Sequence, residues 1–380
     1  MTTVTADDDG DDLTRTSVGQ APVALEALGV AVSAGVPVLL WGSPGTGKTS
    51  AIVALGDALG WHTEVVVGSI REPSDFAGLP VVESGTVRLA APSWANRLAE
   101  AGRGLLFLDE LTTAPPAVQA AMLRIVLERV VGDLTLPDQV QIVAAANPPG
   151  EAADGWDLAP PLANRMVHLE WKVDAKQVAQ GMATGFPQPS FLLPDSPPDV
   201  AYGSVARTVV ATFLRARPEL VLQVPSNTAE ASKGWPSPRS WEMVAKLLGA
   251  CETVKASPEV FAALVVGAVG EGPALEFLSW LQDSDLPDPH AVLAAPQEFV
   301  LPERSDRAFA VLTAVAALAI ARGDRASWMA AWQVVGRAAD VAPDVAALVA
   351  RRLASKRPEG APLPVEVTKL LPILRAAGLL

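Results

Sequence analysis

The residues with the clearest chemical meaning form a glycine-rich segment near the amino terminus. Residues 42–49 read Gly-Ser-Pro-Gly-Thr-Gly-Lys-Thr, which fits the phosphate-binding pattern G-x-x-x-x-G-K-[ST]. Such a loop needs glycines, because its backbone N–H groups must turn inward onto phosphate oxygens and a Cβ atom would obstruct that turn. A plain glycine-rich turn is the alternative. It is disfavoured because an apolar run precedes the segment and a helical stretch follows it.

Each part of this segment has an expected role. The backbone N–H groups and the amino end of the following helix should hold the phosphates. The ammonium group of Lys48 should reach the β- and γ-phosphates, and the hydroxyl of Thr49 should hold Mg²⁺. The sequence therefore predicts that ATP and Mg²⁺ bind here, at Gly42, Ser43, Pro44, Gly45, Thr46, Gly47, Lys48, Thr49 and Ser50.

Two neighbouring carboxylates supply the second half of this chemistry. Residues 105–110 read Leu-Leu-Phe-Leu-Asp-Glu, which is a buried strand that ends in two acids. In open α/β sheets, ligands bind at the carboxyl ends of the strands. We expect Asp109 to hold the Mg²⁺ ion and Glu110 to polarise the attacking water as a general base. An ordinary strand end with solvated acids is the alternative.

The elements that must position these residues alternate along the chain. Apolar runs predict strands at 36–41, 62–67, 105–110, 140–146 and 167–171. Helical stretches lie beside or between them at 21–35, 50–59, 92–102 and 115–130. This alternation predicts an α/β fold, with a parallel five-stranded sheet that helices cover on both faces.

The remaining segments divide the chain. Glu83-Ser84-Gly85 is typical of the turn of a short hairpin, within about 75–90. Beyond a linker at 184–199 only helices are expected, first at 202–216, 238–251, 258–269 and 272–282, and then near 305–321, 325–338, 341–355 and 365–378. The predicted organisation is an acidic, disordered tail (1–20), an α/β core (21–183), a linker rich in Pro, Ser and Asp (184–199), a helical domain (200–282) and a C-terminal helical region (283–380).

Composition excludes several classes of protein. The net charge of −13 disfavours a dedicated nucleic-acid binder, since phosphate contacts need clustered Lys and Arg. The single cysteine, Cys251, cannot form an internal disulfide, which fits a reducing cytoplasm. The longest apolar stretch, 309–321, is too short to span a bilayer. No targeting segment is apparent, so a cytoplasmic protein is expected.

Taken together, the chain resembles the AAA+ ATPases and, within them, the MoxR-like group of the helix-2-insert clade. The resemblance covers about residues 20–282. Besides the two motifs above, it rests on residues 109–123, which read Asp-Glu-Leu-Thr-Thr-Ala-Pro-Pro-Ala-Val-Gln-Ala-Ala-Met-Leu, and on Arg71-Glu72-Pro73-Ser74-Asp75-Phe76-Ala77-Gly78 with the hairpin after it. It implies an αβα core followed by an all-α lid. The C-terminal hundred residues carry no recognisable motif.

The resemblance implies three further site residues. Asn147 is similar to the sensor-1 residue, which orients the attacking water, although Asn before Pro is also common in turns. Arg165 is similar to the arginine finger that a neighbouring subunit supplies, although here Met166 follows it where the family usually has Phe. Arg239 is similar to sensor 2, which reaches from the lid to the γ-phosphate. Arg129 is a weaker candidate for an interface arginine.

The resemblance also implies an activity. The leading interpretation is an ATP hydrolase that assembles into a homo-oligomeric ring, expected to be a hexamer, and remodels or activates a protein partner. Proteins with a von Willebrand factor A domain are frequent partners in this group. The alternatives are the motor subunit of a metal chelatase, a nucleic-acid motor and a nucleotide-dependent scaffold. A nucleic-acid motor is disfavoured because residues 130–138 carry two acids and no Lys or Arg.

Overall fold

A five-stranded sheet forms the centre of the amino-terminal half. The computed structural model describes residues 23–148, 155–186, 189–194, 200–283, 286–367 and 370–371, so the predicted tail at 1–20 lies outside the described residues. The strand order is β2-β5-β8-β1-β9, and every paired neighbour is parallel. The strands are β1 (Val38–Trp41), β2 (His62–Val67), β5 (Arg103–Asp109), β8 (Gln139–Ala146) and β9 (Val167–Glu170). The predicted α/β fold is confirmed.

The two faces of the sheet belong to different cores, because side chains alternate along each strand. On one face Leu39, Leu106 and Leu108 pack with α3 (Ser74–Ala77), α4 (Ser93–Ala101), α5 (Pro116–Glu128) and α6 (Pro160–Ala163). On the other face Leu40 and Phe107 pack with α1 (Val23–Ser33), α2 (Lys48–Leu59) and the helical domain at 200–282, which we call the lid. The lid therefore shares one continuous hydrophobic core with the sheet.

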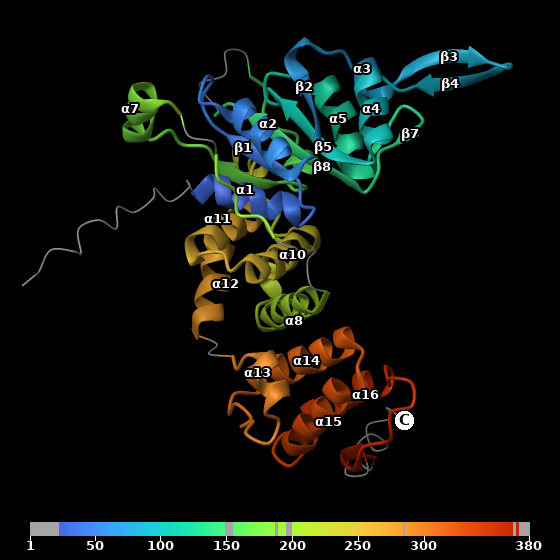
Figure 1. Ribbon diagram of the computed structural model, residues 1–380, viewed down its shortest axis with the longest axis vertical. Helices are drawn as coiled ribbons and strands as arrows, with labels where there is room; N and C mark the ends of the chain where they lie inside the picture. The colour runs from blue at the N-terminus through green and yellow to red at the C-terminus, as the bar shows by residue number, and fades with distance from the viewer. Residues whose placement is uncertain are drawn as a thin grey trace, which may run out of the picture.

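The lid and the C-terminal region are helical, as predicted (Figure 1). The lid comprises α8 (Val200–Ala216), α9 (Thr228–Ala231), α10 (Pro238–Val254), α11 (Pro258–Val269) and α12 (Glu271–Asp283), with a 3₁₀ turn at Pro218–Leu220. Helix α11 lies against α1 and β9. The C-terminal helices are α13 (Pro289–Ala294), α14 (Ser305–Arg322), α15 (Arg325–Ala339) and α16 (Pro343–Ala354), and they form a second core. Helix α14 packs on α8 and joins the two regions.

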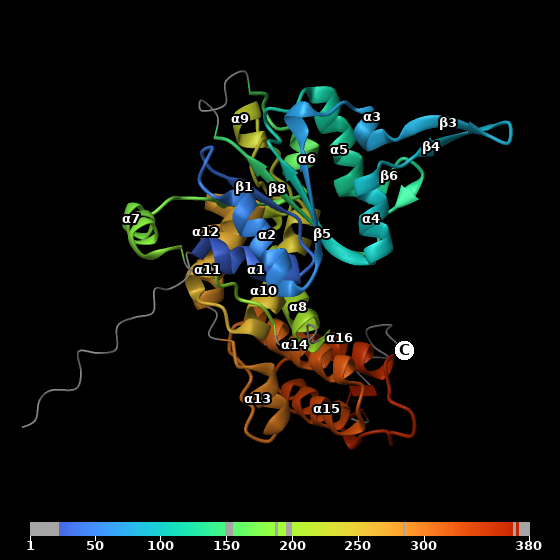
Figure 2. The same cartoon turned by 45° about the horizontal axis from the view of Figure 1, so that its top comes forward.

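Two hairpins leave the sheet on one side. The longer one pairs β3 (Leu79–Glu83) with β4 (Thr86–Ala90) and projects away from the body of the molecule (Figure 2). Its two-residue turn, Ser84-Gly85, has φ angles of 53° and 79°, which is typical of the turn that matches strand twist. The shorter one pairs β6 (Val130–Val131) with β7 (Leu134–Thr135). Asp133 binds the base of the longer hairpin, where its backbone N–H donates to the carbonyl of Leu89 over 2.9 Å.

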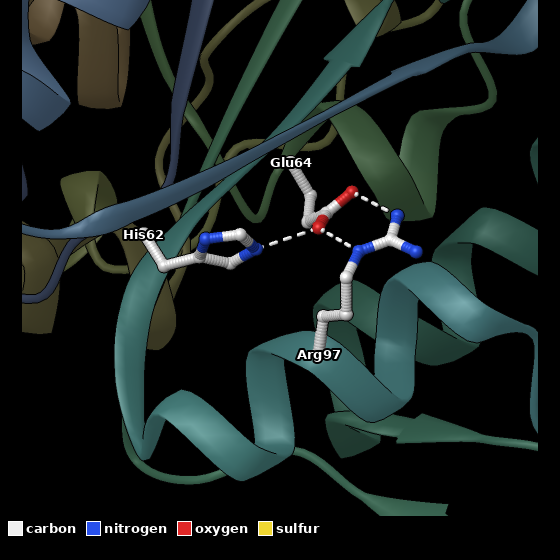
Figure 3. A network of polar contacts seen from close by, with 3 residues as sticks. All are labelled: His62, Glu64 and Arg97. Carbon is white, nitrogen blue, oxygen red and sulfur yellow. Dashed lines mark hydrogen bonds and ion pairs between the residues drawn. The ribbon is translucent and has the colours of Figure 1, made fainter.

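An ionic network fixes the helix that follows the long hairpin. In Figure 3, Arg97 of α4 approaches Glu64 of the edge strand β2 with both ends of its guanidinium group, over 2.6 and 2.8 Å. The imidazole of His62 lies 2.6 Å from the same carboxylate. The hydrogen bond with Arg97 is the main cause that lowers the pKa of Glu64. The network covers the open edge of the sheet with charge and fastens α4 to it.

Some elements differ from the predictions. Helix α7 (Ala175–Thr184) was not predicted and stands apart from the sheet on two connecting segments. Helix α13 lies in a stretch rich in Pro and Asp where no helix was predicted. Of the helix predicted at 365–378, the structure describes helical residues only at 365–367 and 370–371. No helix within the described residues is long and apolar enough to cross a membrane.

Candidate nucleotide-binding site

The glycine-rich segment connects β1 to α2 as a tight loop. Gly45 and Gly47 have φ angles of 73° and 83°, a conformation that side chains with a Cβ atom rarely adopt. Gly42 has a different constraint, because a Cβ atom there would lie 2.8 Å from the carbonyl oxygen of Trp171. Each glycine of the motif therefore answers a backbone requirement of this loop.

The side chain of Lys48 lies beneath the loop. Its Nζ atom donates to the carbonyl of Gly42 over 2.6 Å and to that of Ser43 over 2.9 Å. From the other side, the indole N–H of Trp171 donates to the carbonyl of Thr46 over 3.0 Å. Sequence reasoning placed Trp171 only at the end of a strand and missed this contact, because the pattern of the loop says nothing of β9.

Thr49 and Asp109 face each other at the carboxyl edge of the sheet. The hydroxyl of Thr49, in the first turn of α2, donates to Oδ2 of Asp109 over 2.9 Å. Hydroxyl and carboxylate oxygens are the hard ligands that Mg²⁺ prefers. The donor set therefore fits the predicted magnesium site, and the two residues come from the two motifs that the sequence analysis singled out.

Glu110 follows Asp109 in a strained conformation. Its φ angle is 58°, and such angles in residues other than glycine tend to occur at functional sites. Its backbone N–H donates to Oδ1 of Asp109 over 2.9 Å. Its carboxylate accepts a short hydrogen bond from the hydroxyl of Ser69. Ser69 lies in a 3₁₀ turn (Gly68–Ile70) directly after β2, and its place at a strand end was the only sequence signal for it.

Asn147 lies at the same edge of the sheet. It follows β8, whose last residue, Ala146, is in register with Trp41 at the end of β1. Its backbone N–H donates to the hydroxyl of Thr112 over 3.3 Å. The phosphate loop, the two acids, Ser69 and Asn147 therefore all follow the carboxyl ends of the parallel strands β1, β5, β2 and β8.

Arg165 lies at the opposite edge. It precedes β9 by two residues, and the first residue of β9, Val167, is in register with Val38, the first residue of β1. Its guanidinium group donates to the carbonyl of Pro161. Burial lowers the pKa of Arg165, and the charge of Arg239 lowers it further. Arg239 therefore lies near enough for its charge to act on Arg165 at the amino edge of β9.

One buried relay connects the phosphate loop to this edge. The indole N–H of Trp41 donates to Nδ1 of His168 over 2.9 Å, and Nε2 of His168 lies 2.9 Å from the carbonyl of Ala163. His168 is therefore neutral, with its proton on Nε2. Burial lowers the pKa of His168 to about 4. The relay ends one residue before Asn164, the residue that precedes Arg165.

Arg129 has a structural role within this chain. It caps α5 with a φ angle of 57°. Its guanidinium group donates to the carbonyls of Pro137 and Val140. These bonds hold the short hairpin against β8, so the weaker candidate for an interface arginine is accounted for by contacts inside the chain.

Comparisons with known proteins agree with this geometry. Residues 37–166 match the family described as AAA domain (dynein-related subfamily). The transcriptional regulatory protein XylR of Pseudomonas putida is 32% identical over 141 residues, which are 34% of this chain and 25% of that protein. The pathogenicity locus regulatory protein WtsA of Pantoea stewartii subsp. stewartii is 30% identical over 121 residues, which are 30% of this chain and 38% of that protein.

These relatives share only part of their length with this chain, at most about two fifths. A solved protein of Cytophaga hutchinsonii, provisionally named an ATPase, is 17% identical, with a TM-score of 0.43 over 64% of this chain and 79% of its own. The family match covers the phosphate loop, both acids, Asn147 and Arg165. Residues 37–166 of this chain therefore form an AAA domain, and this match supports the prediction of an ATP hydrolase.

Proposed function

We propose that this protein binds ATP with Mg²⁺ and hydrolyses it at the carboxyl edge of the sheet. The observation that carries the proposal is that Thr49, Asp109 and Glu110 lie together at this edge, with the hydroxyl of Thr49 2.9 Å from Oδ2 of Asp109. Lys48 and the loop N–H groups would hold the phosphates. Thr49 and Asp109 would hold Mg²⁺, which neutralises charge on the phosphates when bound.

Glu110 is the proposed general base. Its carboxylate would accept a proton from the attacking water, which Asn147 would orient. The hydrogen bond from Ser69 fixes one oxygen of this carboxylate, so Ser69 is a positioning residue in this scheme. Removal of the Ser69 hydroxyl should change turnover more than ATP affinity, because it acts on the base and not on the phosphates.

The two arginines support an oligomeric enzyme. Arg165 and Arg239 lie beside each other at the edge opposite to Thr49 and Asp109, so they suit the nucleotide of a neighbouring subunit better than their own. This differs from the expected sensor-2 role, in which Arg239 reads the phosphate of its own chain. We propose a ring, expected to be a hexamer, in which each subunit supplies both arginines to the next.

A protein partner fits this ring better than a nucleic acid. The long hairpin carries one basic residue, Arg88, and it pairs with Glu83 over 3.0 Å. The short hairpin carries Asp133 and no basic residue. The relatives are named transcriptional regulators, but the likeness lies in the AAA part. As in the MoxR-like group, we propose a remodelled protein partner, such as one with a von Willebrand factor A domain.

A pair of variants tests the proposal. Glu110→Gln should keep ATP affinity, measured by calorimetry, and lose most hydrolysis, because only the charge that accepts the proton is removed. Lys48→Ala should lose ATP binding itself. Glu128→Gln, which alters an exposed acid of α5 paired with Arg124, is the matched control and should behave as wild type. Near-normal turnover in Glu110→Gln would exclude Glu110 as the base.

A further inference from the structure

The lid begins in a polar cluster that it shares with the AAA domain. Ser237, the N-cap of α10, donates from its hydroxyl to Oδ1 of Asn164 over 2.7 Å. The amide nitrogen of Asn164 donates to the carbonyl of Trp235 over 2.8 Å. Asn164 is 3% exposed, Ser237 is 6% exposed and Ser240 is fully buried. The cluster therefore joins two segments that lie 73 residues apart without contact with solvent.

The hydrogen bonds of this cluster are closed on themselves. Ser237 and Ser240 exchange two bonds as a capping box, with the backbone N–H of each residue donating to the hydroxyl of the other over 2.8 and 3.1 Å. The hydroxyl of Ser240 also reaches the carbonyl of Trp235 over 2.9 Å. A buried polar network that is fully satisfied specifies one arrangement, because any shift leaves a buried polar atom without a partner.

The cluster adjoins the two arginines along the chain. Asn164 is the residue before Arg165, and Ser237 lies two residues before Arg239. Neither arginine forms an ion pair with a carboxylate among the described residues. Two cations without a counter-ion repel each other, so their neighbourhood needs a cause outside the pair. The buried bond from Asn164 to Ser237 supplies that cause.

The lid and the AAA domain are closely packed around the cluster. A Cβ atom at Gly267 of α11 would lie 2.2 Å from the carbonyl oxygen of His168 in β9. Within the lid, a Cβ atom at Gly234 would lie 2.3 Å from the carbonyl of Gly267, which fixes the segment before α10 against α11. The hydroxyl of Ser232 donates to the carbonyl of Leu158 over 3.1 Å. Backbone thus meets backbone where the lid joins the AAA domain.

We propose that Asn164, Ser237 and Ser240 are positioning residues that lock the lid to its own AAA domain, so that Arg165 and Arg239 act as one rigid clamp on a single phosphate group. This inference rests on the proposed function, in which that phosphate belongs to ATP on a neighbouring subunit. It implies that the lid does not close on the nucleotide of its own chain. Motion takes place between subunits, with each lid and AAA domain moving as one body.

We call the cluster of Asn164, Ser237 and Ser240 the latch. The kinetics of variants in the latch test whether it positions Arg165 and Arg239. Ser237→Ala and Asn164→Ala should lower the turnover number about tenfold or more, because a small misplacement of a catalytic group is costly. ATP affinity should stay unchanged, because the phosphate loop is untouched. Ser237→Thr keeps a hydroxyl and should recover activity. Ser257→Ala removes the N-cap of α11, a serine of the same lid far from Asn164 in sequence, and should retain wild-type turnover.

A double-mutant cycle between Ser237 and Arg239 distinguishes a positioning role of Ser237 from a general loss of structure. If Ser237 acts through Arg239, Ser237→Ala should cost nothing further in an Arg239→Ala background. Full additivity of the two effects would overturn the proposal. Loss of ATP affinity in Ser237→Ala with no change in turnover would also overturn it, because the lesion would then act on the nucleotide site of the same chain.

A distance measurement tests the latch without any need for hydrolysis. Two spin labels report on the position of the lid relative to the AAA domain. They are attached at the exposed positions Glu128→Cys of α5 and Glu242→Cys of α10, in a Cys251→Ser background. We expect one narrow distance, unchanged by a slowly hydrolysed ATP analogue, that broadens in Ser237→Ala. A broad or analogue-dependent distance in the otherwise wild-type chain would overturn the latch. A narrow distance in a protein without ATPase activity would instead overturn the proposed function alone.

Discussion

The junction between lid and AAA domain and the β3–β4 hairpin depart from ordinary protein architecture in opposite directions. The junction buries polar groups, and Ser240 within it is fully buried. The hairpin exposes apolar groups, with Val82 75% and Val87 68% exposed. Buried polar side chains and exposed apolar clusters are both costly arrangements, and each calls for a reason.

This contrast indicates that the junction and the hairpin have different roles. At the junction the side chains of Asn164, Ser237 and Ser240 are hydrogen-bonded to one another or to backbone, so the chain gains a fixed position at the cost of dehydration. At the hairpin, all residues of β3 are exposed, and a two-stranded hairpin has little stability of its own. Its base is held by Asp133, while among the described residues the hydrogen bonds at its tip join Glu83 to Thr86 and Arg88 of the hairpin itself. We infer that the junction sets internal geometry and that the hairpin is a surface for contact with another protein.

The largest effect on stability is expected at the junction. Asn164→Leu removes both hydrogen bonds of the amide, so Ser237 and the carbonyl of Trp235 each lose one buried partner and keep only their bonds with Ser240. We expect unfolding free energy to fall by about 2–3 kcal/mol, in line with the loss of two buried hydrogen bonds. Urea denaturation measures this loss. A change below about 0.5 kcal/mol would show that the cluster holds nothing in place.

The pH dependence of stability should report on the relay next to the junction. The pKa of His168 is about 4 in the folded chain, below its ordinary value near 6.5. Between these values the unfolded chain binds more protons, so stability is lost as pH falls from about 6.5 towards 4. We expect His168 to contribute about 1–2 kcal/mol of that loss between pH 7 and pH 5.

The measurement compares wild type with His168→Gln by urea denaturation at both pH values. The glutamine variant is less stable at pH 7, and its stability should fall less steeply on acidification. Equal slopes in the two proteins would mean that His168 titrates normally in the folded chain, which the buried relay from Trp41 to Ala163 does not allow.

Much of the AAA domain could be predicted from sequence because its signals are local. The apolar runs before Gly42 and before Asp109 define strands within a few residues, and the phosphate loop is a continuous motif. The same holds for α10 and α11, which begin with Ser-Pro. Helix α7 gave no such signal. Its sequence, AKQVAQGMAT, has only a short apolar stripe, and the one buried residue that the structure describes in it is Gly181.

The contacts that sequence could not give are those between distant segments. Ser69 and Glu110 lie 41 residues apart, and Asn164 and Ser237 lie 73 apart. Nothing in the local pattern of either pair announces its partner. The proximity of Arg165 and Arg239 likewise depends on the packing of α11 against β9. Motifs therefore predicted which residues lie at the carboxyl edge, whereas tertiary packing determined that Arg165 and Arg239 are neighbours.

A glycine of the hairpin turn should have an intermediate effect that stays local. Gly85 has a φ angle of 79°, so Gly85→Ala strains the turn by about 1 kcal/mol. Because the hairpin has few contacts with the body, we expect amide exchange to rise within β3 and β4 and to stay unchanged in β2 and β5. Increased exchange throughout the sheet would contradict the separation between hairpin and core. Gly60→Ala, at a left-handed helix end of the core, is the matched comparison.

The smallest effect on stability, and the largest on partner contact, should come from the face of the hairpin. Val82→Ser and Val87→Ser replace exposed side chains that are directly paired across the strands. Since neither side chain is buried, unfolding free energy should change by less than about 0.5 kcal/mol. Basal ATPase activity should also stay at the wild-type level, because Glu83 and Thr86 still pair beside the turn and the nucleotide site is untouched.

Stimulation of that activity by the protein partner should be lost in the double variant, since it removes the apolar surface of the hairpin without disturbing the fold. Leu348→Ser on α16, an exposed apolar residue of the C-terminal region, controls for general loss of surface apolarity and should keep the stimulation. If the hairpin variant is stimulated as well as wild type while the Leu348 variant is not, the contact surface lies in the C-terminal helices and the contrast between junction and hairpin does not extend to function.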